Sequence, residues 1–334
     1  MIKRVLSLFS LLLVIGFHAQ AQLLPRYGDS RTGTTGFQFL KINPDARSCG
    51  MGESNSATSD DLAATFLNPA GLTHLDTSKI HLQVNHTNYI SASNLDYFCI
   101  GKQLNKGTFL AGSLIYLNSG TMPVTTEFMP FGTGQTFRFT DLCLGISLAR
   151  ILTDNFSFGV SAKFIQENVA GIHTRNVVAD FGFQYDVGKG NTRFAVGVSN
   201  FGAAVAPKGE LLQSTLLGDT TYHDFEKIAV PAVFRLGFAS DVIKKNKHLL
   251  TLCAQLNHPT DNNETYTAGM EYCWNKLVYG RLGYQLGVDE SGLPSFGFGF
   301  LLKKKFGGIR IDYGFSQKKL SGTIHHIGLT LALH

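Results

Sequence analysis

The chain has 334 residues, and its 29 Lys and Arg against 24 Asp and Glu give a formal net charge of +5. This balance is not the signature of a nucleic-acid-binding protein, so we expect no nucleic-acid partner. Hydrophobic residues make up 44% of a chain that also contains 36 glycines. An apolar content this high in a glycine-rich chain indicates a large apolar surface.

The N-terminus has the three parts of a secretory signal peptide. Lys3 and Arg4 supply positive charge, residues 5–17 are apolar, and residues 19–21 form a small-residue cleavage site. The apolar run is shorter than the roughly 20 residues of a spanning helix. We therefore predict a signal peptide over residues 1–21 and export of the chain.

A two-residue rhythm of apolar and small or polar side chains repeats from about residue 78 to the end. Residues 228–238, 295–300 and 326–333 show it most clearly. A period of two is typical of strands with two different faces. The second face carries Arg, Lys, Asp and Glu, which a dry sandwich core would not accept. The pattern predicts a barrel in lipid, with apolar side chains outward and polar side chains inward.

Loop lengths support the same fold class, an all-β, 14-stranded antiparallel transmembrane β-barrel over residues 78–334. Short turns such as 105–107 and 152–155 alternate with longer loops, notably 119–136 and 202–226. Outer-membrane barrels have short periplasmic turns and long external loops. The candidate strands lie near residues 78–90, 94–104, 108–118, 137–150, 155–168, 176–187, 192–201, 227–242, 248–257, 264–274, 277–287, 294–303, 305–316 and 322–333.

The predicted inner face carries charges of both signs. Unpaired charges in a narrow lumen are costly, so we expect cross-strand pairs such as Lys163 with Asp180 and Glu271 with Arg281. Two interpretations stay open: a polar conduit, or a network that fixes strand register and ties an internal plug, which we favour. The predicted lumen charges are Lys163, Asp180, Arg235, Glu271, Arg281, Arg310 and Asp312.

Residues 22–77 precede the first strand and are too short to form a domain. Acidic residues at 60–61 favour one or two helical turns, which Pro69 and Gly71 are expected to end. We predict that this segment folds into the periplasmic mouth of the barrel as a plug.

No arrangement of side chains predicts catalysis, a metal site or a cofactor. The histidines lie in no triad-like spacing with Ser or Cys, so we expect no enzyme. Loop 257–264 offers oxygen ligands of the kind calcium prefers, but its spacing fits no established calcium loop. Cys253 and Cys273 lie on neighbouring predicted strands and can bridge, although free thiols are the preferred interpretation.

Several segments resemble one known family in order along the chain. Residues 39–42, 46–52 and 60–72 resemble the N-terminus of the PorV/PorQ family, a Bacteroidetes-type branch of the FadL-like fourteen-stranded barrels. The chain departs from the family at Cys49, where a small residue is usual, and in its non-aromatic end. Further pieces that match are 134–137, 152–154, 156–159, 200–202, 231–237, 257–264, 269–272, 281–284 and 312–313.

The resemblance implies an outer-membrane location in a Gram-negative, Bacteroidetes-like cell, among outer-membrane lipid. Asn68-Pro69-Ala70-Gly71 is similar to the hatch motif with which fatty-acid channels block their lumen. The resemblance also implies a role in type IX secretion, beside a large translocon barrel and in contact with the C-terminal signal domains of exported cargo.

On that interpretation the external loops are the working surface. Exposed apolar groups in a loop indicate a protein contact, and an alternative is that they fold inward over the barrel mouth. A second function stays open: a FadL-like uptake channel for hydrophobic compounds, which would need an apolar pocket above the hatch. The predicted partner-binding residues are Met122, Phe128, Phe131, Leu211 and Leu216.

Overall fold

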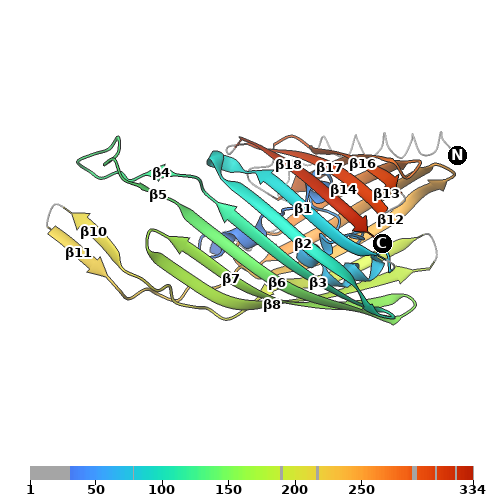
Figure 1. The fold of residues 1–334 in the computed structure, drawn as a ribbon, viewed down its shortest axis with the longest axis horizontal. Helices are drawn as coiled ribbons and strands as arrows, with labels where there is room; N and C mark the ends of the chain where they lie inside the picture. Colours follow the sequence, from blue (N-terminus) through green and yellow to red (C-terminus); the bar gives the residue numbers. More distant parts are fainter. Residues whose placement is uncertain are drawn as a thin grey trace.

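The computed structural model describes residues 31–77, 79–188, 191–215, 218–287, 292–304, 307–319 and 322–333. The predicted signal peptide and Leu216 lie outside these ranges. Fourteen antiparallel strands close into one barrel, which confirms the predicted fold class (Figure 1). The barrel strands are β1 (Ile80–Asn88), β2 (Asn94–Asn105), β3 (Thr108–Asn118), β6 (Phe139–Thr153), β7 (Phe156–Val169), β8 (Ile172–Val187), β9 (Thr192–Phe201), β12 (Val233–Lys245), β13 (His248–Pro259), β14 (Thr265–Trp274), β15 (Val278–Leu286), β16 (Ser295–Lys304), β17 (Gly307–Lys318) and β18 (Gly322–Leu333).

The strands have the two faces that the alternation predicts. On β16 the rings of Phe296, Phe298 and Phe300 are exposed on the outside of the barrel, while the intervening Gly297 and Gly299 face inward. An outward band of apolar side chains matches the hydrocarbon region of a bilayer.

Strand β12 begins later than the sequence predicts. The alternation that starts near residue 227 continues into the barrel only from Val233. Upstream, Ile228 exchanges two backbone hydrogen bonds with Val205, and the carbonyl of Ala229 accepts one from the N–H of Gly36. Pro231 has no N–H for the barrel ladder, so this stretch pairs with a loop and with the N-terminal segment instead.

Two of the long loops contain small hairpins that the sequence did not predict. The first consists of β4 (Met122–Pro123) and β5 (Thr136–Phe137), and the second of β10 (Leu211–Thr215) and β11 (Gly218–Tyr222). Both extend past the barrel rim at the end opposite the short turns (Figure 1). We assign this end to the cell exterior because short turns mark the periplasmic side.

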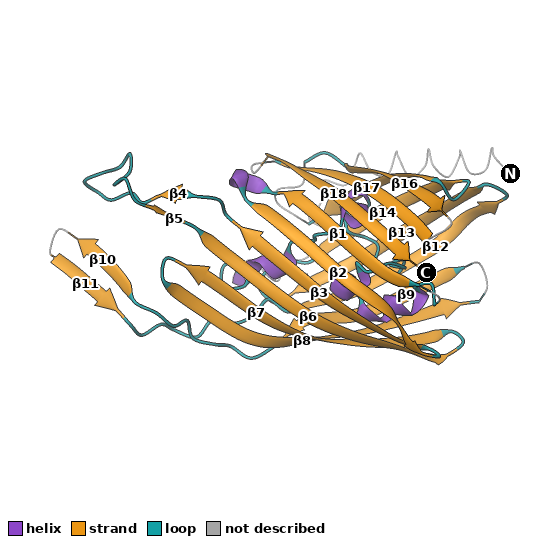
Figure 2. Cartoon of the chain, viewed as in Figure 1, coloured by secondary structure: helices purple, strands orange, loops and turns teal. Residues whose placement is uncertain are grey.

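Residues 31–77, which we call the plug, fold inside the barrel (Figure 2). The helix α3 ends at Leu67, just before Asn68-Pro69, as predicted, and Pro69 then occupies the first turn of η3, where its missing N–H costs nothing. Gly71, which was also expected to end the helix, lies inside η3 instead. No helix among the described residues is long and apolar enough to cross a membrane. The helical elements of the plug are η2 (Gln38–Lys41), α2 (Ala46–Gly50), α3 (Ala64–Leu67) and η3 (Pro69–His74).

The plug backbone packs directly on glycines of the barrel wall. Three pairs of facing glycines on neighbouring strands each leave a notch in the inner wall that the plug fills. Added Cβ atoms would overlap or crowd the plug in all three notches: Asn68, Pro69 and Ala70 at the first, Met51 and Gly52 at the second, Ala46 and Gly50 at the third. The pairs are Gly159 with Gly182, Gly269 with Gly283, and Gly297 with Gly314.

We predict that Gly283→Ala displaces the plug and destabilises the folded barrel. The new methyl group would overlap the carbonyl carbon of Met51, and overpacking of this kind costs about 1–3 kcal/mol. Gly280→Ala on the same strand is the matched control, because a Cβ there meets no atom within 4 Å. Unfolding in urea, followed by gel mobility, should separate the two variants. Equal midpoints would show that the notch tolerates a side chain.

Candidate functional site

Arg47 of the plug is held by carboxylates from the plug and the wall. Its Nη2 and Nε lie 2.8 and 2.9 Å from the two carboxylate oxygens of Glu271 on β14. Its Nη1 donates to Asp61 at 3.2 Å and also to Asp60. A two-point contact between guanidinium and carboxylate fixes orientation as well as distance, so this pair positions α2 against β14.

The same network continues along the wall and returns to the plug. Arg281 lies 2.6 Å from Glu271 and 2.7 Å from Asp312. Arg310 lies 2.7 Å from Asp312 and 2.5 Å from Asp61. We call this closed set, with Arg47, the charge circuit. Every charge in it has opposite charges beside it, which offsets the cost of removing ions from water.

The remaining predicted lumen charges lie elsewhere. Lys163 and Asp180 form an ion pair within the wall, and the backbone N–H of Asn200 donates to Asp180 at 2.8 Å. Arg235 joins neither group: it donates to Ser199 at 2.5 Å, and its guanidinium lies 5.7 Å from the ring centroid of Phe66 in the plug. The seven predicted residues are therefore divided between the circuit, a separate pair and a single contact with the plug.

Sequence analysis missed the plug members of the circuit. Arg47 and the acidic pair at 60–61 belong to a stretch without strand periodicity, so no register assigned them a face. The only available signal was their charge in a segment expected to be buried. A buried Arg is usually paired with a carboxylate, and the wall offered several.

The predicted hatch motif lies over the first glycine notch. Asn68 is buried, and its Nδ2 donates to the carbonyl of Phe183 at 3.0 Å while its Oδ1 accepts from the N–H of Ala70 at 3.2 Å. A Cβ on Gly71 would crowd the carbonyl oxygen of Ser59, at 2.6 Å. The motif thus has a packing role. The side chain of Asn68 reaches the barrel wall, and the absence of a side chain on Gly71 lets the plug backbone fold closely against Ser59.

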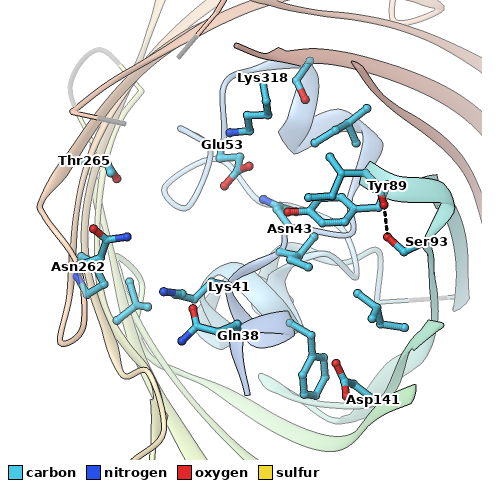
Figure 3. Close-up of a pocket in the computed structure, with 18 of the residues that line it drawn as sticks. Gln38, Lys41, Asn43, Glu53, Tyr89, Ser93, Asp141, Asn262, Thr265 and Lys318 are labelled. Atoms are coloured by element: carbon cyan, nitrogen blue, oxygen red, sulfur yellow. Dashed lines mark hydrogen bonds between the residues drawn. The ribbon is translucent and has the colours of Figure 1, made fainter. Parts of the chain in front are cut away.

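A chamber of about 1060 Å³ lies between the plug and the external end of the barrel. Figure 3 shows Gln38, Lys41 and Asn43 of the plug facing it, with Asn262 on one wall and Asp141 on another. Its apolar lining includes Phe39, Phe66, Leu117, Phe139 and Val169. The lining is thus mixed, with apolar and charged groups on different sides.

Loop 260–264 holds the plug at the chamber floor. Asp261 accepts hydrogen bonds from Lys41 at 2.9 Å, Gln38 at 2.9 Å and Thr35 at 2.5 Å. Burial acts to raise the pKa of this carboxyl, but the three hydrogen bonds outweigh it and hold the pKa below its ordinary value of 3.8. Of the side chains considered for calcium, Asp261 thus binds the plug, while Glu264 contacts His258 of the same loop at 2.9 Å. Within the described ranges, no three His, Cys, Asp or Glu side chains gather to hold a metal.

The predicted partner-binding residues have different environments. Phe128 and Phe131, between β4 and β5, are 72% and 101% exposed, and the neighbouring Met129 is exposed as well. Leu211 on the second hairpin is also exposed. Met122 was predicted to be an exposed loop residue, but its side chain is half-buried and lines the chamber. The reason is that the short strand β4 begins at the barrel mouth.

The five cysteines are all buried free thiols. Cys253 faces Gly269 across the β13–β14 ladder, while Cys273 faces Leu249. The two therefore lie four residues out of register and form no disulfide.

A closed barrel with an apolar outer face and an internal plug defines an outer-membrane β-barrel protein. The fold is similar to that of the toluene transporter TbuX of Ralstonia pickettii, with a TM-score of 0.60 and 13% identity, covering 88% of this chain and 98% of that one. It is also similar to the monoaromatic hydrocarbon channel CymD (TM-score 0.57, 13% identity, 87% and 97% covered). A FadL homologue of Pseudomonas aeruginosa gives a TM-score of 0.54 at 12% identity, with 87% and 98% covered. Identities this low show the fold alone.

Sequence comparison is more specific than these structural matches. Residues 26–258 match the family described as type IX secretion system protein PorV. The chain belongs to this family. A search of curated proteins found no significant match.

Replacing Arg47 by Met should loosen the plug. The change leaves Glu271, Asp60 and Asp61 short of a buried cation, and breaking a buried ion pair costs about 3–5 kcal/mol. We expect easier unfolding in guanidinium and faster passage of small sugars in a liposome-swelling assay. Arg193→Met is the control, because Arg193 pairs at 2.8 Å with Asp241 of the wall. If both variants pass solute at the wild-type rate, the circuit does not hold the plug.

The contact between Lys41 and Asp261 should depend on pH in the acid range only. The pKa of Asp261 is lower in the folded protein than its ordinary value of 3.8. The stabilisation that Asp261 gives the folded protein is therefore complete above about pH 3.8, and it is lost as the pH falls through the pKa of the folded state. Amide hydrogen exchange in residues 35–41, corrected for the intrinsic exchange rate, should accelerate as the pH falls through the pKa of folded Asp261. Asp261→Asn should show the faster exchange already at neutral pH, and Asp154→Asn, in an exposed turn, should not. Exchange in residues 35–41 that is as slow in Asp261→Asn as in the wild type at neutral pH would contradict the assignment.

Proposed function

We propose that this protein is a binding barrel of type IX secretion in the outer membrane of a Bacteroidetes-like cell. Its external hairpins would bind the large translocon barrel, the C-terminal signal domains of exported cargo, or both. The observation that carries the proposal is the apolar tip between β4 and β5, formed by Phe128, Met129 and Phe131. The proposal assigns the protein no catalytic step.

The tip has the character of a protein contact. Phe131 has its whole surface in solvent, and Phe128 and Met129 are more than half exposed. Aromatic residues and Met are enriched at protein interfaces, where their burial supplies much of the binding energy. The tip stands on a hairpin beyond the barrel rim, where a partner in or above the membrane reaches it without entering the lumen (Figure 1).

The closed lumen supports a role for the outer surface. The plug is held by the glycine notches on several strands and by the charge circuit on β14, β15 and β17. Transport through the barrel would require these contacts to separate, whereas partner binding at the hairpins requires no change in them.

A hydrophobic uptake channel is the second candidate. The chamber above the plug is the observation that favours it, because Phe39, Leu117 and Phe139 give it an apolar side. Two proteins of similar fold are described as a toluene transporter and a monoaromatic hydrocarbon channel. This function would depend on chamber residues and would not depend on the hairpin tip.

Replacing Phe128, Met129 and Phe131 together by Ser should reduce binding to the secretion machinery at least tenfold. The readout is recovery of the large translocon barrel and of cargo C-terminal domains with a tagged copy purified from native outer membranes in mild detergent. Glu127→Gln is the control, since it changes charge in the same loop and keeps the apolar tip. Heat-dependent gel mobility should be unchanged, because the tip contributes nothing to the barrel core.

Two results would contradict the proposal. Equal recovery of partners with the Ser variant would place the contact elsewhere. Bound hydrophobic compound without protein partners would favour the uptake channel, and uptake of labelled toluene by cells carrying the Ser variant would then equal that of the wild type.

A further inference from the structure

Two carboxylates face each other on the chamber wall. Asp141 on β6 and Glu167 on β7 are direct cross-strand partners, and both line the chamber. Asp141 is only 5% exposed. Figure 3 shows it at the edge of the chamber, on the wall formed by these strands.

These two groups lack compensation from the protein. Among the described residues, neither forms an ion pair, and Asp141 accepts no hydrogen bond. Glu167 accepts one hydrogen bond, from the backbone N–H of Phe37. Like charges directly opposite on neighbouring strands are destabilising, and a low-dielectric site strengthens their repulsion. The arrangement therefore leaves two carboxyl groups side by side on the chamber wall with no ion-pair partner in the described part of the chain, and a cation beside them would stabilise their charged form.

The nearby cations are engaged in other directions. Lys41 pairs with Asp261, and Figure 3 shows it pointing toward the Asn262 wall, away from Asp141. Lys163 pairs with Asp180.

Arg235 and Lys318 also line the chamber, but they are bonded elsewhere. Arg235 donates to Ser199, and Lys318 donates to Gln285. Within the described residues, neither forms an ion pair with Asp141 or Glu167. A positive group between these two carboxyls would therefore have to enter the chamber from outside.

Apolar side chains surround these two carboxyl groups. Leu117, Phe139 and Val169 come from the same group of strands and also line the chamber, as does Phe39 of the plug. The volume of about 1060 Å³ is slightly above the usual range of small-molecule sites, so a compact organic molecule fits inside. The chamber thus combines a pair of carboxyl groups with an apolar surface beside it.

We propose that the chamber binds an amphiphilic cation, with a protonated amine between Asp141 and Glu167 and an apolar body against Phe139 and Leu117. The site belongs to the lumen and is separate from the hairpin tip. Its ligand class also differs from a neutral hydrocarbon, which would gain nothing from the two carboxylates.

The test compares three probes of one size on the full chain in lipid nanodiscs, with empty nanodiscs as the blank. Titration calorimetry at pH 7.5 should show 2-phenylethylammonium binding at least tenfold more tightly than 2-phenylethanol or phenylacetate. The double variant Asp141→Asn, Glu167→Gln should lose at least tenfold in amine affinity and keep its affinity for the alcohol. Asp154→Asn, in an exposed turn, should bind the amine like the wild type.

A single variant keeps the proposal testable if the double variant does not fold. Glu167→Lys places an internal ammonium opposite Asp141, so it should fold at least as stably as wild type and lose amine binding. Equal affinities for the amine and the alcohol, or unchanged amine binding in Glu167→Lys, would overturn the proposal. Neither result bears on partner binding at the hairpins.

Discussion

The plug and the barrel wall touch backbone to backbone, and this contact requires glycine at paired positions of the wall. The plug follows the inner surface from β7 to β17 and meets paired glycines at three places. A side chain at any of these paired glycines would push the plug away from the barrel wall. Because the spacing is fixed by the backbones, the positions of Arg47, Asn68 and the chamber floor all depend on it. The ion pairs of the charge circuit then fix one position of the plug among those that the glycine notches allow.

The barrel was predictable because its signal is local. Each strand repeats the same two-residue alternation, and the alternation follows from burying one face in lipid, so fourteen strands and their facing were available without tertiary information. The cross-strand pair of Lys163 with Asp180 also follows from register. The predicted start of β12 was wrong because Ile228 and Val230 continue the alternation, while the backbone of Ile228 pairs with Val205 and that of Ala229 with Gly36.

The plug and the hairpins were less predictable because tertiary contacts determine them. Residues 46–61 have no period, and their structure comes from the fit to wall glycines and from ion pairs with residues more than 200 positions away. The β4–β5 ladder is two residues long on each side, too short for any alternation. The environment of Met122 depends on where that ladder meets the rim, which the loop sequence does not specify.

The position of the circuit in the chain determines the order of assembly. The plug is synthesised before the barrel strands, yet the charge circuit that holds it includes Glu271, Arg281 and Arg310, which lie in three of the last five barrel strands. Arg47 therefore has no wall partner until the chain is nearly complete. The barrel also closes only when β18 pairs with β1, next to the same sector. The strands that Asn68 and Pro69 contact, β7 and β8, are complete earlier, so the plug is attached to the wall at one end before the circuit and the closing strand fix the other.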